Sequence, residues 1–252
     1  MKKLFLILPL WLISITISAQ KLERRKDTVF RPGEELRYRL RYGFITAAEA
    51  TLSVETTDVK IDNRSLYHLV VDGRTTGAFD VFYKVRDRYD SYVDQNTLLP
   101  YLYTENIREA KYKRKDKVRF YPDQKKIVST KGTYPAPTQT FDLVSTFYFA
   151  RNLDLSSVKQ GQTFKMNYFL NDEVSNLEIE YTGKERVKTA VGEFNCLKFS
   201  PSIQPGRIFK KDSKLYLWIT DDNNRIPVKA QVELLVGSLT LELTRTKNLK
   251  YP

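Results

Sequence analysis

The chain has 252 residues but only one cysteine, Cys196, and one histidine, His68. A single thiol cannot form an intrachain disulfide, and these two residues cannot build a Cys/His zinc site or a multi-histidine metal centre. The sequence also lacks a phosphate-binding loop, a dinucleotide-binding glycine motif and the Gly-x-Ser-x-Gly element of many hydrolases. These absences exclude several enzyme classes, and we predict a protein without a metal or other cofactor.

Long apolar runs are also missing, except at the N-terminus. There, two lysines precede an apolar stretch over residues 4–17, which is shorter than the roughly 20 residues that span a bilayer. Small residues lead to a cleavage site after Ala19, and the next residue is Gln20 rather than the cysteine of a bacterial lipoprotein. We therefore predict a signal peptide over residues 1–19 and an exported protein, in the periplasm or, as the alternative, outside the cell.

Acidic residues are fewer than basic ones, 30 against 42, so the formal net charge is +12. A hydrophobic content of 41% indicates a folded chain rather than a disordered one. Residues 20–252 are long enough for one large domain, with two sheet halves joined near residues 132–162 as the alternative. Because the chain is exported and has no nucleic-acid-binding motif, its basic charge indicates an anionic envelope partner and not nucleic acid.

Apolar and polar residues alternate along most of the chain, which is typical of strands with one buried face. Roughly a dozen such segments are joined by short turns, and this predicts a mainly antiparallel sheet. Two of the predicted strands are NLEIEYTG, residues 176–183, and KERVKTAVG, residues 184–192, with a glycine at the joint. A sheet of this size must curl, close or fold over to protect its edges. We predict a large curved sheet or half-barrel, whose mouth could hold a ligand, with a completely filled core as the alternative.

One segment changes to helical spacing. Over residues 142–152, Val144, Tyr148 and Arg151 fall on one side, and Asp142 is available as the N-cap. We predict one helix here that covers the sheet, and a shorter helical turn over residues 78–82. Two prolines over residues 133–140 predict a crossover just before the longer helix.

Few residues are candidates for acid–base chemistry. His68 lies in an alternating segment without a nucleophile motif, so we interpret it as a packed strand histidine. The acidic pairs Asp221-Asp222 and Asp172-Glu173 lie in turn-like segments, where aspartate is common. Cys196 is expected to be a buried thiol. We predict a protein that is not an enzyme, with a hydrolase of envelope glycan or ester as the alternative.

Two segments carry a cation at every second position, so each strand would present a basic row on one face. A row of like charges protects an exposed strand edge or meets an anionic partner, here an envelope polymer or a lipid headgroup. The predicted rows are Arg37, Arg39 and Arg41, and Lys111, Lys113, Lys115, Lys117 and Arg119.

Aromatic residues form the third group of candidates. Tyrosine and tryptophan combine an apolar body with a polar tip, which suits a lipid or other amphipathic ligand as well as a sheet core. Both interpretations stay open for five residues. The predicted ligand-binding residues are Tyr38, Tyr42, Phe147, Tyr148 and Trp218.

Four segments, in this order, resemble the bacterial exported proteins grouped as domain of unknown function 3108: FRPGEELRYRLRYGFITAAEATL, YKVRDRYDSYVD with the following LLPYLY, DLVSTFYFAR, and WITDDNNRIPVK with VGSLTLEL. The end of the predicted signal peptide resembles those of Bacteroidetes. The resemblance implies an exported, sheet-rich domain and no catalytic residues. Where the family usually has a glycine, this chain has residues 47–50, AAEA, at an expected bulge. The last segment is also similar to the end of lipoprotein-carrier half-barrels, which shield acyl chains.

Overall fold

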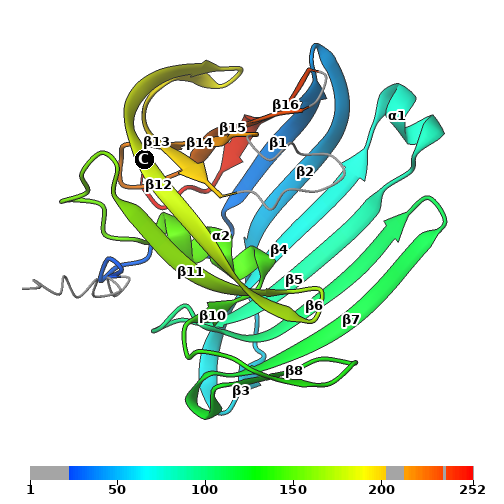
Figure 1. The fold of residues 1–252 in the computed structure, drawn as a ribbon, viewed down its shortest axis with the longest axis vertical. Helices are drawn as coiled ribbons and strands as arrows, with labels where there is room; N and C mark the ends of the chain where they lie inside the picture. Colours follow the sequence, from blue (N-terminus) through cyan, green and yellow to red (C-terminus); the bar gives the residue numbers. More distant parts are fainter. Residues whose placement is uncertain (1–22, 203–212, 235–236, 252) are drawn as a thin grey trace, which may run out of the picture.

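The computed structural model describes residues 23–202, 213–234 and 237–251. The predicted signal peptide, residues 1–19, lies outside the described residues. The described chain forms one sheet, and Figure 1 shows this sheet curving around a helix. The strands of the first half are β1 (Glu35–Tyr42), β2 (Ile45–Glu55), β3 (Lys60–Ile61), β4 (Arg64–Thr75), β5 (Arg86–Asp94), β6 (Pro100–Glu109), β7 (Tyr112–Tyr121), β8 (Lys126–Val128) and β9 (Thr133–Pro135).

The second half of the chain adds the remaining strands to the same sheet. They are β10 (Thr140–Phe141), β11 (Thr163–Leu170), β12 (Glu173–Thr189), β13 (Gly192–Pro201), β14 (Leu215–Thr220), β15 (Pro227–Glu233) and β16 (Ser238–Lys247). The helices are α1 (Gly77–Phe82), α2 (Leu143–Arg151) and a short 3-10 helix, η1 (Pro122–Gln124).

The sheet is open and almost entirely antiparallel. Its order is β10-β11-β12-β13-β14-β15-β16-β1-β2-β4-β5-β6-β7-β8-β9, with β3 beside β4. The pairing of β1 with β16 joins the two halves of the chain, and β10 pairs with β11 in the one parallel contact among the described strands. The predicted mainly β fold is confirmed. The edges, β9 and β10, are very short, which limits the backbone left open to edge-to-edge association.

The predicted number of strands was too low, because the described residues form sixteen and not a dozen. Strands β3, β8, β9 and β10 are only two or three residues long, too short to show an alternating pattern. In one place the sequence predicted too many strands, because the two segments predicted at residues 176–183 and 184–192 form the single 17-residue strand β12. A bulge between Tyr181 and Gly183 bends β12 while its pairing with β13 continues.

The predicted bulge near residues 47–50 is present. On β1, Leu40 and Arg41 are consecutive, yet they pair with Ala48 and Thr46 of β2. Ala47 is therefore the extra residue on β2, and it is buried. A β-bulge increases the local twist of the strand, which contributes to the curvature of the sheet.

Helix α2 begins at the predicted cap. The Asp142 carboxylate accepts hydrogen bonds from the backbone N–H groups of Val144 and Ser145, both at 2.8 Å. In return the Asp142 N–H donates to the Ser145 hydroxyl at 2.9 Å, which completes a capping box. An N-cap of this kind contributes about 1 kcal/mol.

Helix α2 lies inside the curve of the sheet (Figure 1). Its side chains Val144, Tyr148 and Phe149 belong to the main hydrophobic core. Each large apolar side chain buried in this way contributes about 1.5–3 kcal/mol relative to exposure. The sheet residues of the same core include Leu69, Val93, Tyr103, Val118, Phe164 and Phe199.

A buried ion pair holds the end of α2. The Arg151 guanidinium contacts both carboxylate oxygens of Glu34, at 2.6 and 3.2 Å, and each side chain is at most 1% exposed. Arg151 also donates to the backbone oxygens of Asn224 and Arg225 at 3.0 and 3.2 Å. The helix is thereby tied to the N-terminal segment and to the turn before β15.

Candidate functional site

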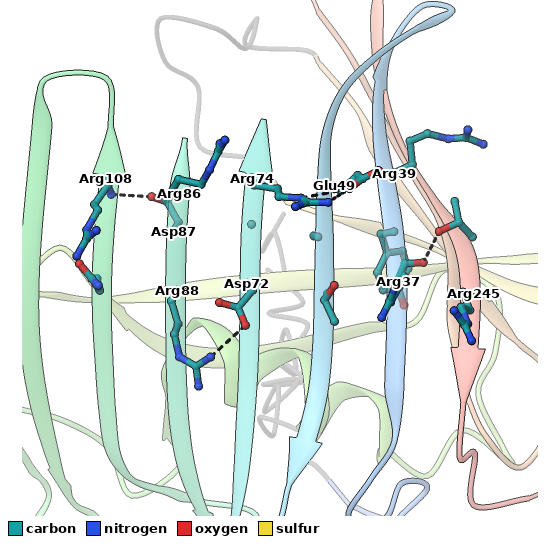
Figure 2. Close-up of a pocket in the computed structure, with 16 residues that line it drawn as sticks. Arg37, Arg39, Glu49, Asp72, Arg74, Arg86, Asp87, Arg88, Arg108 and Arg245 are labelled. Carbon is teal, nitrogen blue, oxygen red and sulfur yellow. Dashed lines mark hydrogen bonds and ion pairs between the residues drawn. The ribbon is translucent and has the colours of Figure 1, made fainter. Parts of the chain in front are cut away.

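The face of the sheet opposite α2 carries a depression of about 820 Å³, bordered by β16, β1, β2, β4, β5 and β6. Side chains alternate between the two faces of a strand. On β4, for example, Leu69 enters the core around α2, whereas Asp72 and Arg74 border the depression. Figure 2 shows side chains of this outer face projecting from adjacent strands.

Cross-strand pairing places the lining residues in two rows. Residues that pair directly across adjacent strands lie on the same face and close together. The first row is Arg245, Arg37, Thr51, Asp72, Arg88 and Asn106. The second row is Arg39, Glu49, Arg74 and Arg86. Arg108 follows Asn106 on β6 and completes a set of seven arginines.

Some of these arginines are neutralised by nearby carboxylates. Arg74 contacts Glu49 at 2.9 Å, and Arg88 contacts Asp72 at 3.1 Å. Arg86 makes a bidentate contact with Asp80 of α1, at 2.6 and 2.9 Å.

The contact with Arg86 keeps Asp80 ionised. Hydrogen bonds from Arg86 and Thr75 lower the pKa of the Asp80 carboxyl to about 2. The pair is therefore charged at any physiological pH, and it anchors α1 to the edge of the depression.

Three of the seven arginines carry an unbalanced charge. The guanidinium groups of Arg39, Arg108 and Arg245 form no ion pair within 4.0 Å with a described residue, although the Arg108 backbone N–H donates to the Asp87 carboxylate at 2.9 Å (Figure 2). Guanidinium groups present several N–H donors in a rigid plane that matches phosphate, sulfate and carboxylate oxygens. Neighbouring cations also raise the local concentration of anions. The depression is therefore suited to anion binding. Its described lining includes no serine, cysteine or histidine.

The two predicted basic rows lie on this same outer face. Lys113 of β7 pairs with Arg108, and Lys115 pairs with Asn106, so β7 continues the arginine surface. These residues border a second, smaller depression of about 460 Å³. Lys113, Lys115 and Lys117 are all exposed. We call the surface from Arg245 across to Lys115 the arginine face.

Three members of the predicted rows do not extend the arginine face. Lys111 lies in the turn before β7, so the expectation that it belongs to the strand was wrong. Arg41 pairs with Glu242 at 2.9 Å. Arg119 pairs with Asp62 at 2.8 Å and lies over aromatic rings, which neutralises it locally.

Five arginines of the site were not singled out from the sequence. For two of them a signal was present, because Arg86 and Arg88 alternate within RDRYD, as the predicted rows do. Arg108 is the only cation of β6, Arg74 lies ten residues from Arg64 on β4, and Arg245 alternates only with Lys247 on β16. Only the pairing of strands shows that these three arginines lie together. The five are Arg74, Arg86, Arg88, Arg108 and Arg245.

The five aromatic candidates lie at several places. Tyr38 is buried, donates its hydroxyl to the Pro227 carbonyl at 2.9 Å, and also borders the arginine depression. Tyr148 packs edge-on against Phe30. Phe147 packs against the main hydrophobic core and against a second cluster of buried residues that includes Tyr38 and Trp218.

The remaining two aromatic candidates lie on other strands. Trp218 on β14 is buried, with the Lys198 and Lys229 amines 5.0 and 4.8 Å from its ring. Tyr42 lies at the end of β1, where its ring approaches Gly237. A ligand-binding role for the five stays a prediction.

His68 lies on the outer face of β4 within a charged network. Its Nε2 is 2.8 Å from Asp90, its Nδ1 is 3.5 Å from Glu55, and its ring stacks on Tyr92 at 4.3 Å. Burial raises the pKa of Asp90, but hydrogen bonds from His68 and Arg88 outweigh it and lower the pKa overall. The histidine is thus a packed strand residue with both ring nitrogens near carboxylates.

The acidic pairs have structural roles in turns. The Asp222 carboxylate accepts hydrogen bonds from the Asn224 and Arg225 backbone N–H groups at 2.9 and 3.0 Å. Asp172 pairs with Lys131 at 2.7 Å and accepts from the Ser129 hydroxyl at 2.7 Å. Asp222 thus fixes its own turn, whereas Asp172 joins the β11–β12 turn to the β8–β9 turn.

The remaining observations concern the single cysteine, metal-ligating side chains and membrane-spanning helices. Cys196 is buried, as expected, and burial raises the pKa of its thiol to about 12. Among the described residues, no group of three metal-ligating side chains comes together. Within the same residues, no helix combines the length and apolarity needed to cross a bilayer.

Comparison with solved structures shows the fold. A β-barrel-like protein of domain of unknown function DUF1849 from Brucella abortus is 9% identical, with a TM-score of 0.59, covering 88% of this chain and 99% of that one. A protein with a YmcC-like fold from Bacteroides fragilis is 12% identical, with a TM-score of 0.41, covering 88% and 100%. The comparison with curated proteins found no significant match.

A family model also matches the chain. The model is described as protein of unknown function DUF3108, and it matches residues 37–244. The match includes most of the described sheet, from β1 to β16, and all seven arginines except Arg245. The resemblance found in the sequence is thereby confirmed.

Proposed function

The chain belongs to the DUF3108 family, and we propose that it binds an anionic component of the cell envelope through its arginine face. The observation that carries the proposal is the convergence of seven arginines on one depression. The guanidinium groups of three of them, Arg39, Arg108 and Arg245, form no ion pair with a described residue. A bound phosphate, sulfate or carboxylate group would supply the missing charge.

The inner face of the sheet offers weaker support for ligand binding. An amphiphile held in a half-barrel would need the space inside the curve of the sheet. That region contains α2 and the aromatic side chains Phe30, Tyr148 and Phe149, which are almost completely buried. The outer face, in contrast, has an open depression with unbalanced charge. We therefore place the site on the outer face.

The proposed role is binding and not catalysis. The arginine face offers charge and hydrogen-bond donors, and the described lining has no nucleophile next to a general base. The predicted signal peptide, residues 1–19, would deliver the protein to the envelope, where phosphorylated and acidic glycans and lipids are the available anions. Binding of such a group through several cations would weaken as ionic strength rises.

Titration calorimetry with dextran sulfate and with uncharged dextran tests the proposal, because the two polymers differ only in their sulfate groups. We expect binding of dextran sulfate alone. The double variant Arg39→Gln/Arg108→Gln should bind about tenfold more weakly or worse, since hydrogen bonds to charged groups each contribute about 1.5–3 kcal/mol. Raising the salt concentration should weaken the binding of dextran sulfate by the wild-type protein.

A control variant separates the site from net charge. Lys165→Gln/Arg186→Gln removes two exposed cations from β11 and β12, outside the arginine face. We expect this variant to bind like the wild type. Equal losses in both double variants would show that only net charge matters, and binding that does not respond to salt would contradict the proposal.

A further inference from the structure

One end of the sheet carries a group of exposed apolar side chains. The register places three connections at this end: the β1–β2 turn, α1, and the β6–β7 turn. Figure 1 shows the β1–β2 hairpin and α1 at this same end. Hydrogen bonds link the three connections, because Thr76 donates to the Ala47 carbonyl at 3.0 Å and Ala110 donates to the Lys84 carbonyl at 2.7 Å.

The apolar side chains here are among the most exposed of the described residues. Phe44 is 90% exposed, Phe82 is 86% exposed and Val81 is 82% exposed. Helix α1 buries none of its residues. We call this group the apolar rim, which consists of Phe44, Ile45, Val81, Phe82, Tyr83 and Tyr112.

The arrangement differs from that of a core or a flat protein interface. Adjacent large apolar residues at the tips of turns leave most of their surface in water, which soluble proteins usually avoid unless the surface has a partner. Projecting tips can enter a layer that deforms around them. The interfacial zone of a lipid bilayer has that property and accommodates aromatic rings with a polar edge, such as tyrosine.

The charges next to the rim favour a negatively charged partner. Lys84 lies two residues after the end of α1 and Lys111 lies in the β6–β7 turn, and both are exposed. Lys84, Lys111 and Lys113 form no ion pair with another described residue. The arginine face begins one residue from this end, at Arg74 beside Thr75. Apolar tips surrounded by free cations complement a surface that is apolar inside and anionic outside.

We propose that the apolar rim docks on a bilayer that contains anionic phospholipids, with Phe44 and Phe82 entering the headgroup–acyl boundary. Lys84 and Lys111 then lie at the level of the phosphate groups, where each cation near an anionic surface contributes about fivefold to the partition coefficient. The inference extends the proposed function in one respect, because it identifies lipid headgroups as the anions next to the arginine face. The docking itself depends on the rim.

Sedimentation with vesicles tests the docking. The mature protein should sediment with vesicles of phosphatidylcholine and phosphatidylglycerol and much less with phosphatidylcholine alone. The double variant Phe44→Ser/Phe82→Ser should lose about tenfold in partition coefficient for each ring removed from the lipid. The matched control is Val59→Ser, because Val59 is also exposed but follows the opposite end of β2. It should bind like the wild type.

A fluorescent probe reports insertion directly. We expect Phe82→Trp to show a blue shift with anionic vesicles and quenching by brominated lipids, beyond the signal of the wild type. Val59→Trp should show neither change. If Phe82→Trp stays in water while the protein is bound to vesicles, then binding is only electrostatic and the proposed insertion is wrong.

The remaining outcomes separate the rim from other partners and from the arginine face. A stable dimer in light scattering that Phe44→Ser/Phe82→Ser dissociates would identify the rim as a contact between copies and overturn the membrane proposal. If Arg39→Gln/Arg108→Gln no longer binds dextran sulfate and the wild type inserts into vesicles, then both anion binding by the arginine face and docking by the apolar rim are supported. Insertion without any dextran sulfate binding would refute the proposed function alone.

Discussion

Asp142 shows how much one residue contributes to this fold. Its carboxylate caps α2 and accepts a hydrogen bond from the Ser91 hydroxyl of β5 at 2.6 Å, so it also joins the helix to the sheet. The side chain is completely buried. Burial raises the pKa of Asp142 to about 6, although hydrogen bonds from Ser145 and Ser91 oppose the shift.

The raised pKa makes stability depend on pH. The unfolded carboxyl titrates near pH 4, so between about pH 4 and 6 the folded state binds more protons. The stability that Asp142 contributes is therefore complete below about pH 4 and is lost as pH rises through 6. Asp142→Asn does not titrate and keeps a cap of similar strength. From pH 4 to 8, the free energy of unfolding of the wild type should fall by up to about 3 kcal/mol relative to that of this variant.

Urea unfolding of both proteins across this pH range measures the difference. Asp123→Asn, a change on an exposed side chain in η1, is the control and should follow the wild type at every pH. A constant difference between Asp142→Asn and the wild type would mean that the buried carboxyl does not titrate in this range.

At the scale of single elements, β12 shows where sequence patterns mislead. Its residues were predicted as two strands because the alternation is interrupted near Gly183. The structure keeps one strand and places a bulge there, with Gly183 at a φ of +132°. Residues other than glycine rarely adopt this backbone conformation, so the glycine permits the bend without ending the strand.

We expect Gly183→Ala to destabilise the protein by about 1–3 kcal/mol, the usual cost of a strained backbone conformation. The nearest atoms to an added Cβ belong to the Gln160 side chain at 3.8 Å, so the cost comes from the backbone and not from a clash. Gly73→Ala is the matched strand control, since its φ is not positive and an added Cβ meets no atom within 4 Å. It should change stability by about 0.5 kcal/mol or less. Equal urea midpoints for both variants would contradict the backbone argument.

At the scale of the whole molecule, one continuous sheet connects the two halves of the chain. The link is the pairing of β1 with β16, in which Leu40 faces Leu241 and Tyr38 faces Leu243. The hydrophobic core contains residues from β2 to β14 together with α2. Neither half could keep its apolar face buried without the other, which favours a single cooperative unit.

We therefore expect the chain without its predicted signal peptide, residues 20–252, to unfold in one transition. Trp218 lies in the second half and is the only tryptophan of residues 20–252, so its fluorescence reports on that half. Far-UV circular dichroism reports on the whole sheet. The two urea curves should coincide, and an earlier transition by one probe would support two independently folding halves.

Local interactions made part of this protein predictable. Alternation of side chains along a strand and the capping of α2 depend on residues that are close in the chain. The sequence therefore determined the sheet class, the helix with its Asp142 cap and the face on which each basic row lies relative to its own strand, whereas the bulge at residues 47–50 was expected only from the family resemblance. The short strands were missed because two or three residues carry too little pattern.

Only the tertiary structure decided which strands are neighbours. Arg37 and Arg245 lie almost at opposite ends of the chain, yet the pairing of β1 with β16 brings them into register. Strand order results from hydrogen bonding and burial summed over the whole sheet, and no local segment carries that information. This ordering turned two separate basic rows into one arginine face and brought Phe44 and Phe82 to the same end of the molecule.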